Sequence, residues 1–507
     1  MVIENKILFF ILLFVVTAFF LIRVHRRYDS GKAMLIFQVL ISFYVTVFCS
    51  YLIFNLYADS PTFLFMRGKA FGLSFNLEPI GIVFLNMVSF LWFLTSLYSL
   101  GYVSINSKIN ASKFSFFMIS AISSTFMLAI SGDLITAFIF YELLTLLTFP
   151  LIIATGVQKE IIAARKYLFI LIMCSLVLFL PAIAMVYYFT GGVEFAIGGV
   201  LKSSNIAVTL AIIVFLMFIY GAAKTAIMPV HFWLPSAMAA PIPVSAMLHA
   251  VVVVKSGLLV LLKIIVYIYG VDYLTDIIKS FWHSNFIVIL CGVSVVLSAV
   301  IALYQGNIKK LLAYSTINHM SICLLSILMF SAVGIKAAIV HMIGHAVSKL
   351  SLFFVTGILE SKYKIAKISD LKGLVKRSKS LAFIFTLATV SMIGLPPLAG
   401  FAGKAYIFYA IVAGKVDYFA ATALSISILL SASYFIRLVH NIYFVVNQRS
   451  SLGTSRHHGY FETAMKCATI LGCIYILFYV FSFPFLMKFL DKIQFKNLAK
   501  ILNETVQ

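Results

Sequence analysis

The sequence is short of charged residues. Only 11% of its 507 residues are Asp, Glu, Lys or Arg, whereas 63% are hydrophobic and the mean hydropathy is +1.09. In a soluble domain about a quarter of the residues are charged, so this composition excludes a soluble globular protein. Apolar runs long enough to cross a bilayer recur along the whole chain. We therefore expect an all-α integral membrane protein.

Acidic residues are the scarcest charged type, with 16 Asp and Glu against 38 Lys and Arg and a net charge of +22. Such an excess can indicate nucleic-acid binding, but no basic stretch interleaved with aromatic residues accompanies it. The preference of Lys and Arg for the cytoplasmic loops of membrane proteins explains the charge better. The expected surroundings are a lipid bilayer, with no nucleic acid bound.

Cysteine is rare and follows no ligand pattern. The six cysteines are scattered along the chain and include no CxxC pair: Cys49, Cys174, Cys291, Cys323, Cys467 and Cys473. This spacing argues against a disulfide framework, an iron–sulfur cluster and a zinc site. The sequence also lacks a nucleotide-binding loop and a haem-ligand signature. We therefore expect no metal, no cofactor and no redox or hydrolytic site in this chain.

Windows of about 20 apolar residues predict about fourteen transmembrane helices in a single polytopic domain over residues 1–507. The first window has no small-residue cleavage site after it, so it is interpreted as a retained span and not a signal peptide. A short amphipathic tail is expected at 488–507. The predicted spans are 6–22, 33–57, 79–103, 114–130, 134–154, 167–190, 206–230, 243–269, 286–303, 312–330, 334–359, 381–411, 417–443 and 464–487.

The loops give this count an independent check, because Lys and Arg should gather on one side of the membrane. Loops after odd-numbered spans carry most of the loop Lys and Arg, and the densest group runs from Lys362 to Lys379. This bias predicts that the odd loops are cytoplasmic. Both termini would then lie on the outer, periplasmic side of the cell inner (plasma) membrane.

Several ionisable residues fall inside the predicted spans. Each charge near the bilayer centre costs roughly 2.5–3.5 kcal/mol even on the mildest scale, so these side chains must face protein or water. Lys263 lies near the end of its span, where it is expected to snorkel to the interface. The others are Glu142, Lys224, Lys255, Lys349, Lys404 and Arg437, together with His249, His319, His341, His345 and His440. The sequence leaves open whether Arg437 and His440 take part in the site.

Glu142 and Lys224 have two interpretations. They can form a buried ion pair that only fixes helix packing. Alternatively, the carboxylate can favour the protonated lysine when it is close and release the proton when its influence is removed. The sequence favours the second interpretation, because further buried lysines accompany this pair.

His341, His345 and Lys349 follow one another at intervals of four residues, which places them on one helix face. A relay for protons or ions is favoured over a polar seam that neighbouring helices satisfy. His249 and Lys255 are six residues apart and therefore point to different faces. His319, taken alone, is equally compatible with a satisfied core histidine.

Two predicted spans are interrupted, and each interruption has a lysine beside it. The stretch from Gly221 to Gly257 contains Lys224, four prolines and Lys255, and the stretch from Gly394 to Lys404 contains two prolines. Irregular backbone at membrane depth is tolerated where it is buried in protein or lines a watery cavity. The breaks lie five spans apart, which predicts two inverted five-helix repeats, at 114–269 and 286–443, with two discontinuous helices.

These motifs together resemble the antiporter-like subunits of respiratory complex I, membrane-bound hydrogenases and Mrp-type multisubunit cation/proton antiporters. The matching stretches are YELLTLLTF, Lys224 with MPVHFWLPSA, PIPVSAMLHA with Lys255, KKLLAYSTINHMS, HMIGHAVSKLSLF and GLPPLAGFAGK. The resemblance implies fourteen helices with two inverted half-channels. It also implies a Glu142–Lys224 charge pair in the first half-channel, a central axis of Lys255, His249, His345 and Lys349, and Lys404 in the second half-channel.

The resemblance leaves the parent complex open. A lysine at 404 fits a D-type Mrp subunit or an N-type complex I subunit, whereas the sequences around His249 and Lys349 are closer to those of L- and A-type subunits. The favoured function is a proton-translocating subunit of a Mrp-type Na+/H+ antiporter with other membrane subunits as partners. The alternatives are a proton-pumping subunit of NADH:quinone oxidoreductase or a related oxidoreductase, and a degenerate paralogue that acts as a scaffold.

Overall fold

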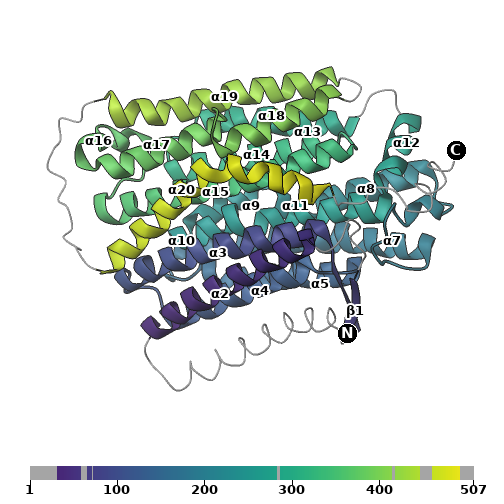
Figure 1. Ribbon diagram of the computed structural model, residues 1–507, viewed down its shortest axis with the longest axis horizontal. Helices are drawn as coiled ribbons and strands as arrows, with labels where there is room; N and C mark the ends of the chain where they lie inside the picture. Colours follow the sequence, from purple (N-terminus) through teal and green to yellow (C-terminus); the bar gives the residue numbers. More distant parts are fainter. Residues whose placement is uncertain are drawn as a thin grey trace.

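The protein is a bundle of helices that run roughly parallel to one axis (Figure 1). The computed structural model describes residues 31–58, 66–70, 72–281, 286–413, 417–445 and 460–491. The longer helices are α2 (Gly31–Ala58), α3 (Pro79–Ile105), α4 (Ala111–Ala129), α5 (Leu134–Ile152), α6 (Gln158–Cys174), α7 (Leu180–Thr190), α8 (Val208–Gly221), α11 (Val253–Lys263), α12 (Val271–Phe281), α13 (Phe286–Leu303), α14 (Ile308–Ile327), α15 (Ala332–Tyr363), α17 (Lys379–Ile393), α18 (Ala399–Ala413), α19 (Tyr418–Tyr443) and α20 (Tyr460–Leu490).

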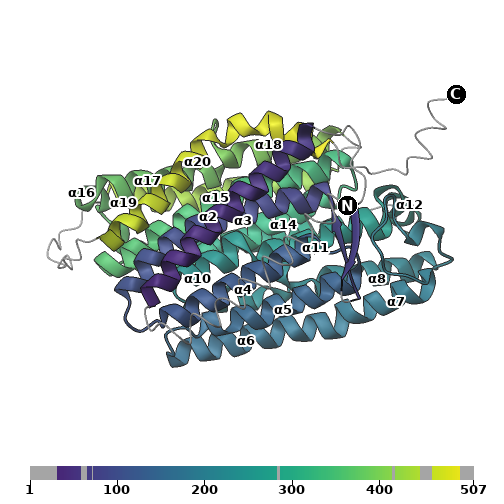
Figure 2. The same cartoon turned by 60° about the horizontal axis from the view of Figure 1, so that its bottom comes forward.

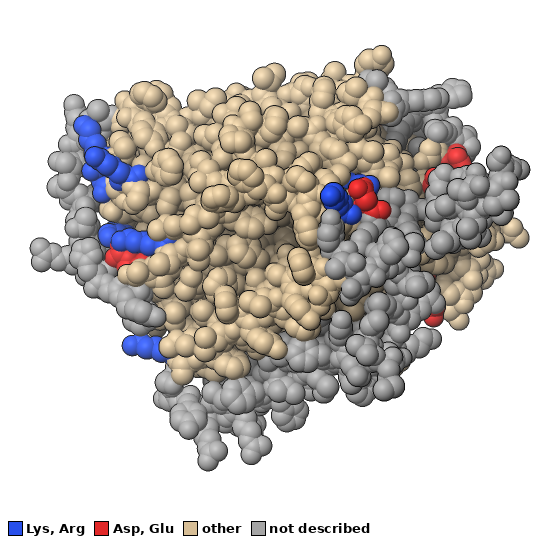
Figure 3. Space-filling view, in the orientation of Figure 1, with Lys and Arg blue, Asp and Glu red and all other residues tan. Residues whose placement is uncertain are grey.

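The surface has the charge distribution of a protein that crosses a membrane. Lys and Arg gather at the end of the bundle where α16 (Leu374–Arg377) lies, and a broad band without charge covers most of the visible face (Figure 3). Ten helices in the described part of the chain are long and apolar enough to span a bilayer. The fold is therefore that of a mostly helical, multi-pass membrane protein.

Helices occupy the predicted positions from residue 33 onward, but α6 begins at Gln158, nine residues before the predicted 167, and α8 ends at Gly221, nine residues before the predicted 230. The predicted first span, 6–22, lies outside the described residues, as does nearly all of the predicted tail at 488–507. The count of fourteen spans therefore stays a prediction. The inverted relation of 114–269 to 286–443 stays one as well.

The first predicted break lies between α8 and α10 (Ile242–Ala246). Helix α8 ends at Gly221, and the chain continues through η3 (Ala223–Thr225), η4 (Val230–Phe232), α9 (Trp233–Ser236) and η5 (Ala237–Ala239). Prolines lack a backbone donor and clash with the preceding turn, which explains why no continuous helix forms here. The indole of Trp233 donates to the carbonyl oxygen of Ala223 at 3.0 Å, satisfying one of the backbone groups that the break releases.

The second predicted break separates α17 from α18. Helix α17 ends at Ile393, and the next residue, Gly394, has a φ of 92°, a left-handed conformation that suits glycine. Helix α18 starts again at Ala399. Its residue Gly400 lies directly against the end of α17, because a Cβ at this position would fall 1.8 Å from the carbonyl oxygen of Ser391.

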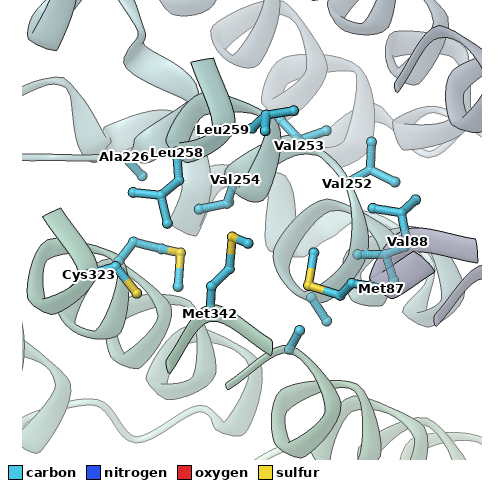
Figure 4. Packing of buried hydrophobic residues seen from close by; sticks show 14 of the residues in the cluster. Met87, Val88, Ala226, Val252, Val253, Val254, Leu258, Leu259, Cys323 and Met342 are labelled. Carbon is cyan, nitrogen blue, oxygen red and sulfur yellow. The ribbon is translucent and has the colours of Figure 1, made fainter. Parts of the chain in front are cut away.

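Between the two breaks lies the most deeply buried part of the chain. The segment Ile242–Tyr269 is completely buried, and it contains α11 between two π-helical segments, η6 (Met247–Val251) and η7 (Ile264–Tyr269). The apolar side chains of α11 pack against Met87 of α3, Cys323 of α14 and Met342 of α15 (Figure 4). This segment therefore forms the centre of the hydrophobic core, where a charged side chain has no access to solvent.

The all-α expectation misses one element. Strands β1 (Met66–Ala70) and β2 (Leu73–Leu77) form an antiparallel hairpin in which Met66 pairs with Leu77. The hairpin lies at the end of the bundle opposite α16, with α12 at the same end (Figures 1 and 2). Strand β2 leads directly into Glu78, which precedes the first turn of α3.

The tight contact at the second break generates a stability prediction. Replacing Gly400 with Ala should lower the free energy of unfolding by about 1–3 kcal/mol, because the new methyl group would push α18 away from α17. The measurement is thermal unfolding of the purified protein in detergent. Gly306→Ala is the matched control, since no atom lies within 4 Å of its added Cβ. Equal unfolding temperatures for the two variants would contradict the contact.

Candidate functional site

Lys224 lies in the first break and is fully buried. Its ammonium group donates to the backbone carbonyl oxygen of Tyr141 and lies over the ring of the same tyrosine, 3.1 Å from the centroid. The Tyr141 hydroxyl in turn accepts from the Lys224 backbone N–H at 3.1 Å. One tyrosine of α5 therefore fixes both the backbone and the side chain of this lysine.

Glu142 lies beside this contact but does not form the ion pair that the family resemblance implies. Among the described residues, Lys224 has no carboxylate within the 4.0 Å limit for an ion pair. Glu142 is only half buried, and its Oε1 atom has no hydrogen-bond partner. The physical reason is that the Tyr141 carbonyl and ring occupy the space around the ammonium group.

Lys255 lies at the start of α11, where the π-helical turn before it changes the hydrogen-bonding pattern. Its ammonium group donates to the carbonyl oxygen of His249 at 2.5 Å and lies 3.2 Å from Nδ1 of His345 on α15. The prediction from spacing placed Lys255 and His249 on different faces. The contact runs through the His249 carbonyl, while the His249 ring packs on Phe353 with centroids 5.4 Å apart.

Three histidines from two helices continue from Lys255. His319 of α14 contacts His341 of α15 through Nδ1 and Nε2, 3.0 Å apart, and its ring lies 4.9 Å from that of His345. All three rings are buried. The structure therefore places His319 in this cluster, which its isolated position in the sequence could not decide.

The ring nitrogens of His249 are both buried without a hydrogen-bond partner within the described part of the chain. One nitrogen of each clustered histidine is in the same situation: Nε2 of His319, Nδ1 of His341 and Nε2 of His345. Buried polar atoms of this kind are normally satisfied by water.

Lys349 and Lys404 extend the set into the second half of the chain. Lys349 donates to the Leu312 carbonyl oxygen at 3.0 Å and to the Ser315 hydroxyl. Lys404 donates to the carbonyl oxygens of Met392 and Ile393, at 3.0 and 2.8 Å, which the end of α17 leaves unpaired. Each lysine therefore uses acceptors that lie in the break or on a neighbouring helix.

Glycines bring these elements into direct contact. A Cβ on Gly257 would lie 2.5 Å from the Thr225 nitrogen, so α11 packs on the backbone that carries Lys224. A Cβ on Gly403 would lie 2.6 Å from Nδ1 of His341, which places the neighbour of Lys404 against the histidine cluster. The titratable residues thus form a series on elements that pack directly on one another.

Two candidates lie away from this series. Arg437 donates to the Gln305 carbonyl oxygen at 2.7 Å, and His440 is exposed near the end of α19, where its ring stacks on Phe444. Neither makes a contact with the buried lysines within the described residues. The structure therefore does not bring Arg437 or His440 into the site.

The expectation that Lys263 snorkels is wrong. Its side chain is 0% exposed and forms an ion pair of 2.8 Å with Glu78, which is 2% exposed. The ammonium group also donates to the carbonyl oxygens of Ala129 and Ser131, at 2.7 and 2.9 Å. Glu78 precedes α3 and lies outside the predicted span 79–103, so it is not among the predicted intramembrane charges. The useful signal was an acid directly before an apolar run in a chain with few acids.

The arrangement can hold and pass protons. Lysine is a donor in both protonation states, and a neutral histidine has one donor and one acceptor nitrogen, so neighbouring groups can exchange protons. No group of three or more His, Cys, Asp or Glu side chains in the described ranges could hold a metal ion.

Comparison with known proteins matches residues 131–431 to the family model described as NADH:quinone oxidoreductase/Mrp antiporter, TM. The chain is 27% identical over 323 residues to the D subunit of the Na(+)/H(+) antiporter of Alkalihalophilus pseudofirmus, a match that covers 62% of each chain, less than two thirds of the relative's length. It is 29% identical over 407 residues to the N subunit of the NADH-quinone oxidoreductase of Pelagibacter ubique, covering 78% of this chain and 84% of that one.

Among solved structures, a chain of the Mrp complex from Dietzia sp. DQ12-45-1b has the same fold. The TM-score is 0.82 at 18% identity, and the match covers 97% of both chains. At this identity the likeness shows the fold alone. The two named relatives belong to different complexes, so the comparisons do not distinguish a Mrp-type subunit from a complex I subunit.

The two acidic residues generate a second prediction. Glu78→Gln should lower the free energy of unfolding by about 3–5 kcal/mol, because it leaves the buried Lys263 cation without its counter-charge. Glu142→Gln should change it by about 1 kcal/mol or less, since no ion pair is lost. Chemical or thermal unfolding of both variants in detergent measures the difference. A Glu142→Gln variant that is as unstable as Glu78→Gln would show that the carboxylate at 142 is paired.

Proposed function

The chain belongs to the NADH:quinone oxidoreductase/Mrp antiporter transmembrane family, and we propose that it is the proton-translocating subunit of a Mrp-type monovalent cation/proton antiporter. The observation that carries the proposal is the contact series of Lys255, His345, His319 and His341 between two broken helices. Sodium is the expected counter-ion, and other membrane subunits are the expected partners. The chain would lie in the cell inner membrane with both termini on the outer side.

In this proposal the proton moves along Lys224, Lys255, Lys349 and Lys404, with the histidines and hydroxyl groups between them. His249, His319, His341 and His345 act as the relay, aided by water at their unpaired ring nitrogens. Each lysine that lacks a carboxylate partner can be buried as a neutral amine at lower cost than as a cation. Proton arrival and departure therefore need no ion pair to be broken at these positions.

Glu142 would act as the electrostatic gate. Glu142 follows Tyr141, whose carbonyl oxygen accepts from Lys224, so its charge would attract a protonated Lys224 although the two groups do not form an ion pair. A small movement of α5 or of η3 would change this attraction, because the Coulomb energy of partly buried charges depends strongly on their separation. In the two proposed inverted half-channels, Lys224 and Lys404 would hold equivalent places.

A second candidate is a proton-pumping subunit of an NADH:quinone oxidoreductase. The match to the N subunit of that enzyme supports it, because this match covers more of both chains than the match to the antiporter relative. The same series of side chains would serve, and electron transfer in other subunits would drive it. Purification of the assembled complex distinguishes the two, since only the oxidoreductase carries flavin and iron–sulfur subunits.

Transport through Lys224 generates the third prediction. In membrane vesicles that contain the assembled complex, sodium should dissipate an imposed pH gradient without NADH, and Lys224→Met should slow this by about a hundredfold. Methionine keeps the side-chain volume and removes the charge. Lys310→Met is the matched control, because Lys310 is exposed on the surface of α14. Unchanged transport in Lys224→Met would rule out this path, and transport that depends on NADH would favour the oxidoreductase.

A further inference from the structure

The Glu78–Lys263 ion pair lies outside the proton path and has a different character from the lysines within it. Lys263 is the only one of the five fully buried lysines with a carboxylate partner among the described residues. Its ammonium donates to the carbonyl oxygens of Ala129 and Ser131 and lies 2.8 Å from Glu78 Oε1 in the ion pair. Lys263 therefore has a counter-charge in contact, which the lysines proposed to carry protons lack within the described residues.

The pair joins segments that are distant in sequence. Glu78 links strand β2 to α3, Ala129 is the last residue of α4, and Ser131 lies in the turn between α4 and α5. The hairpin is attached to the same turn, because the Asn76 N–H donates to the Ile130 carbonyl and the Gly132 N–H donates to the Ser74 carbonyl, each at 2.7 Å. The hairpin, α3 and the α4–α5 turn therefore converge on Lys263.

Lys263 and Lys255 lie at the two ends of α11. Eight residues of regular helix separate them by about 12 Å, and π-helical segments flank the helix on both sides. A change of hydrogen-bonding pattern within a helix often marks a site where its direction can change. Helix α11 is thus a short rigid unit between two adaptable turns, with Lys263 fixed at one end and Lys255 against His345 at the other.

We propose that Glu78 and Lys263 are positioning residues for Lys255. The ion pair anchors the far end of α11 to the hairpin and the α4–α5 turn, and this anchor sets where Lys255 lies relative to His345. A displacement of the hairpin would be passed through Glu78 to Lys263 and along α11 to the proton path. The transport readout of this proposal rests on the proposed function, whereas its structural readout does not.

Packing around α11 supports a movement of the helix as a unit. The side chains of Val253, Val254, Leu258 and Leu259 meet other apolar side chains, including the flexible Met342 and Met87 (Figure 4). Apolar contacts have no fixed direction, and methionine adapts easily to small shifts. The directional contacts that fix the helix along its axis are therefore the polar ones at the two lysines, beside the close packing of Gly257 on the Thr225 backbone.

The test shortens the side chain of the acid in the ion pair and keeps both charges. Glu78→Asp deletes one methylene, so α11 must shift to keep the ion pair. In the double variant Glu78→Asp with Lys263→Arg, the longer arginine side chain spans the distance that the shorter acid leaves. In the assembled complex, proton transport by Glu78→Asp should fall by roughly tenfold to a hundredfold, and its pH profile should change. The double variant should recover both. Asp491→Asn is the control, because it breaks a partly exposed ion pair with Lys336.

The structural readout is electron cryo-microscopy of the assembled complex at side-chain resolution. In Glu78→Asp, the 3.2 Å contact between Lys255 Nζ and His345 Nδ1 should lengthen, and it should return in the double variant. If that contact is unchanged in Glu78→Asp, the positioning role is overturned, whatever happens to transport. Loss of assembly with an unchanged pH profile per assembled complex would also overturn it. If the wild type moves no protons, the proposed function fails, and the cryo-microscopy result alone decides the positioning role.

Discussion

The burial of five lysine ammonium groups is the constraint on which the rest of the structure depends. Each of these side chains, Lys224, Lys255, Lys263, Lys349 and Lys404, is at most 4% exposed. A cation without acceptors cannot be held in such a place. Each of the five ammonium groups donates a hydrogen bond to a backbone carbonyl oxygen. These oxygens lie at a broken helix, at a π-helical turn, at a helix end or on a neighbouring helix. The irregular backbone is therefore part of the site.

The five lysines divide into two kinds. Lys263 has a carboxylate partner and two carbonyl acceptors, and it holds elements together. The other four have carbonyls, hydroxyls or histidine nitrogens, and no carboxylate within ion-pair distance in the described part of the protein. Such groups can lose or gain a proton without leaving a counter-charge stranded. This difference separates the residues proposed to carry protons from the pair proposed to position them.

The sequence predicts much of this arrangement, because apolar length and proline spacing are local properties. They predict the helices from residue 33 onward, the two breaks and four of the five buried lysines. Contacts between helices are not local, and there the prediction is weaker. Nothing in the spacing of His319 indicates that it meets His341, and the family resemblance implied a Glu142–Lys224 pair where the Tyr141 carbonyl lies. The prediction for Lys263 is wrong because a residue near the end of a span need not reach the membrane interface. Here the hairpin and the α4–α5 turn cover its side chain.

The central claim is that Lys255 joins the two halves of the path through His345, and Lys255→Met tests it most directly. Methionine has a similar volume and removes an unpaired buried cation, so the folded complex should be as stable as the wild type or more stable. Sodium-driven proton transport by vesicles that contain equal amounts of assembled complex should nevertheless fall to the background of vesicles without it. A stable Lys255→Met complex that transports protons at the wild-type rate would contradict the account.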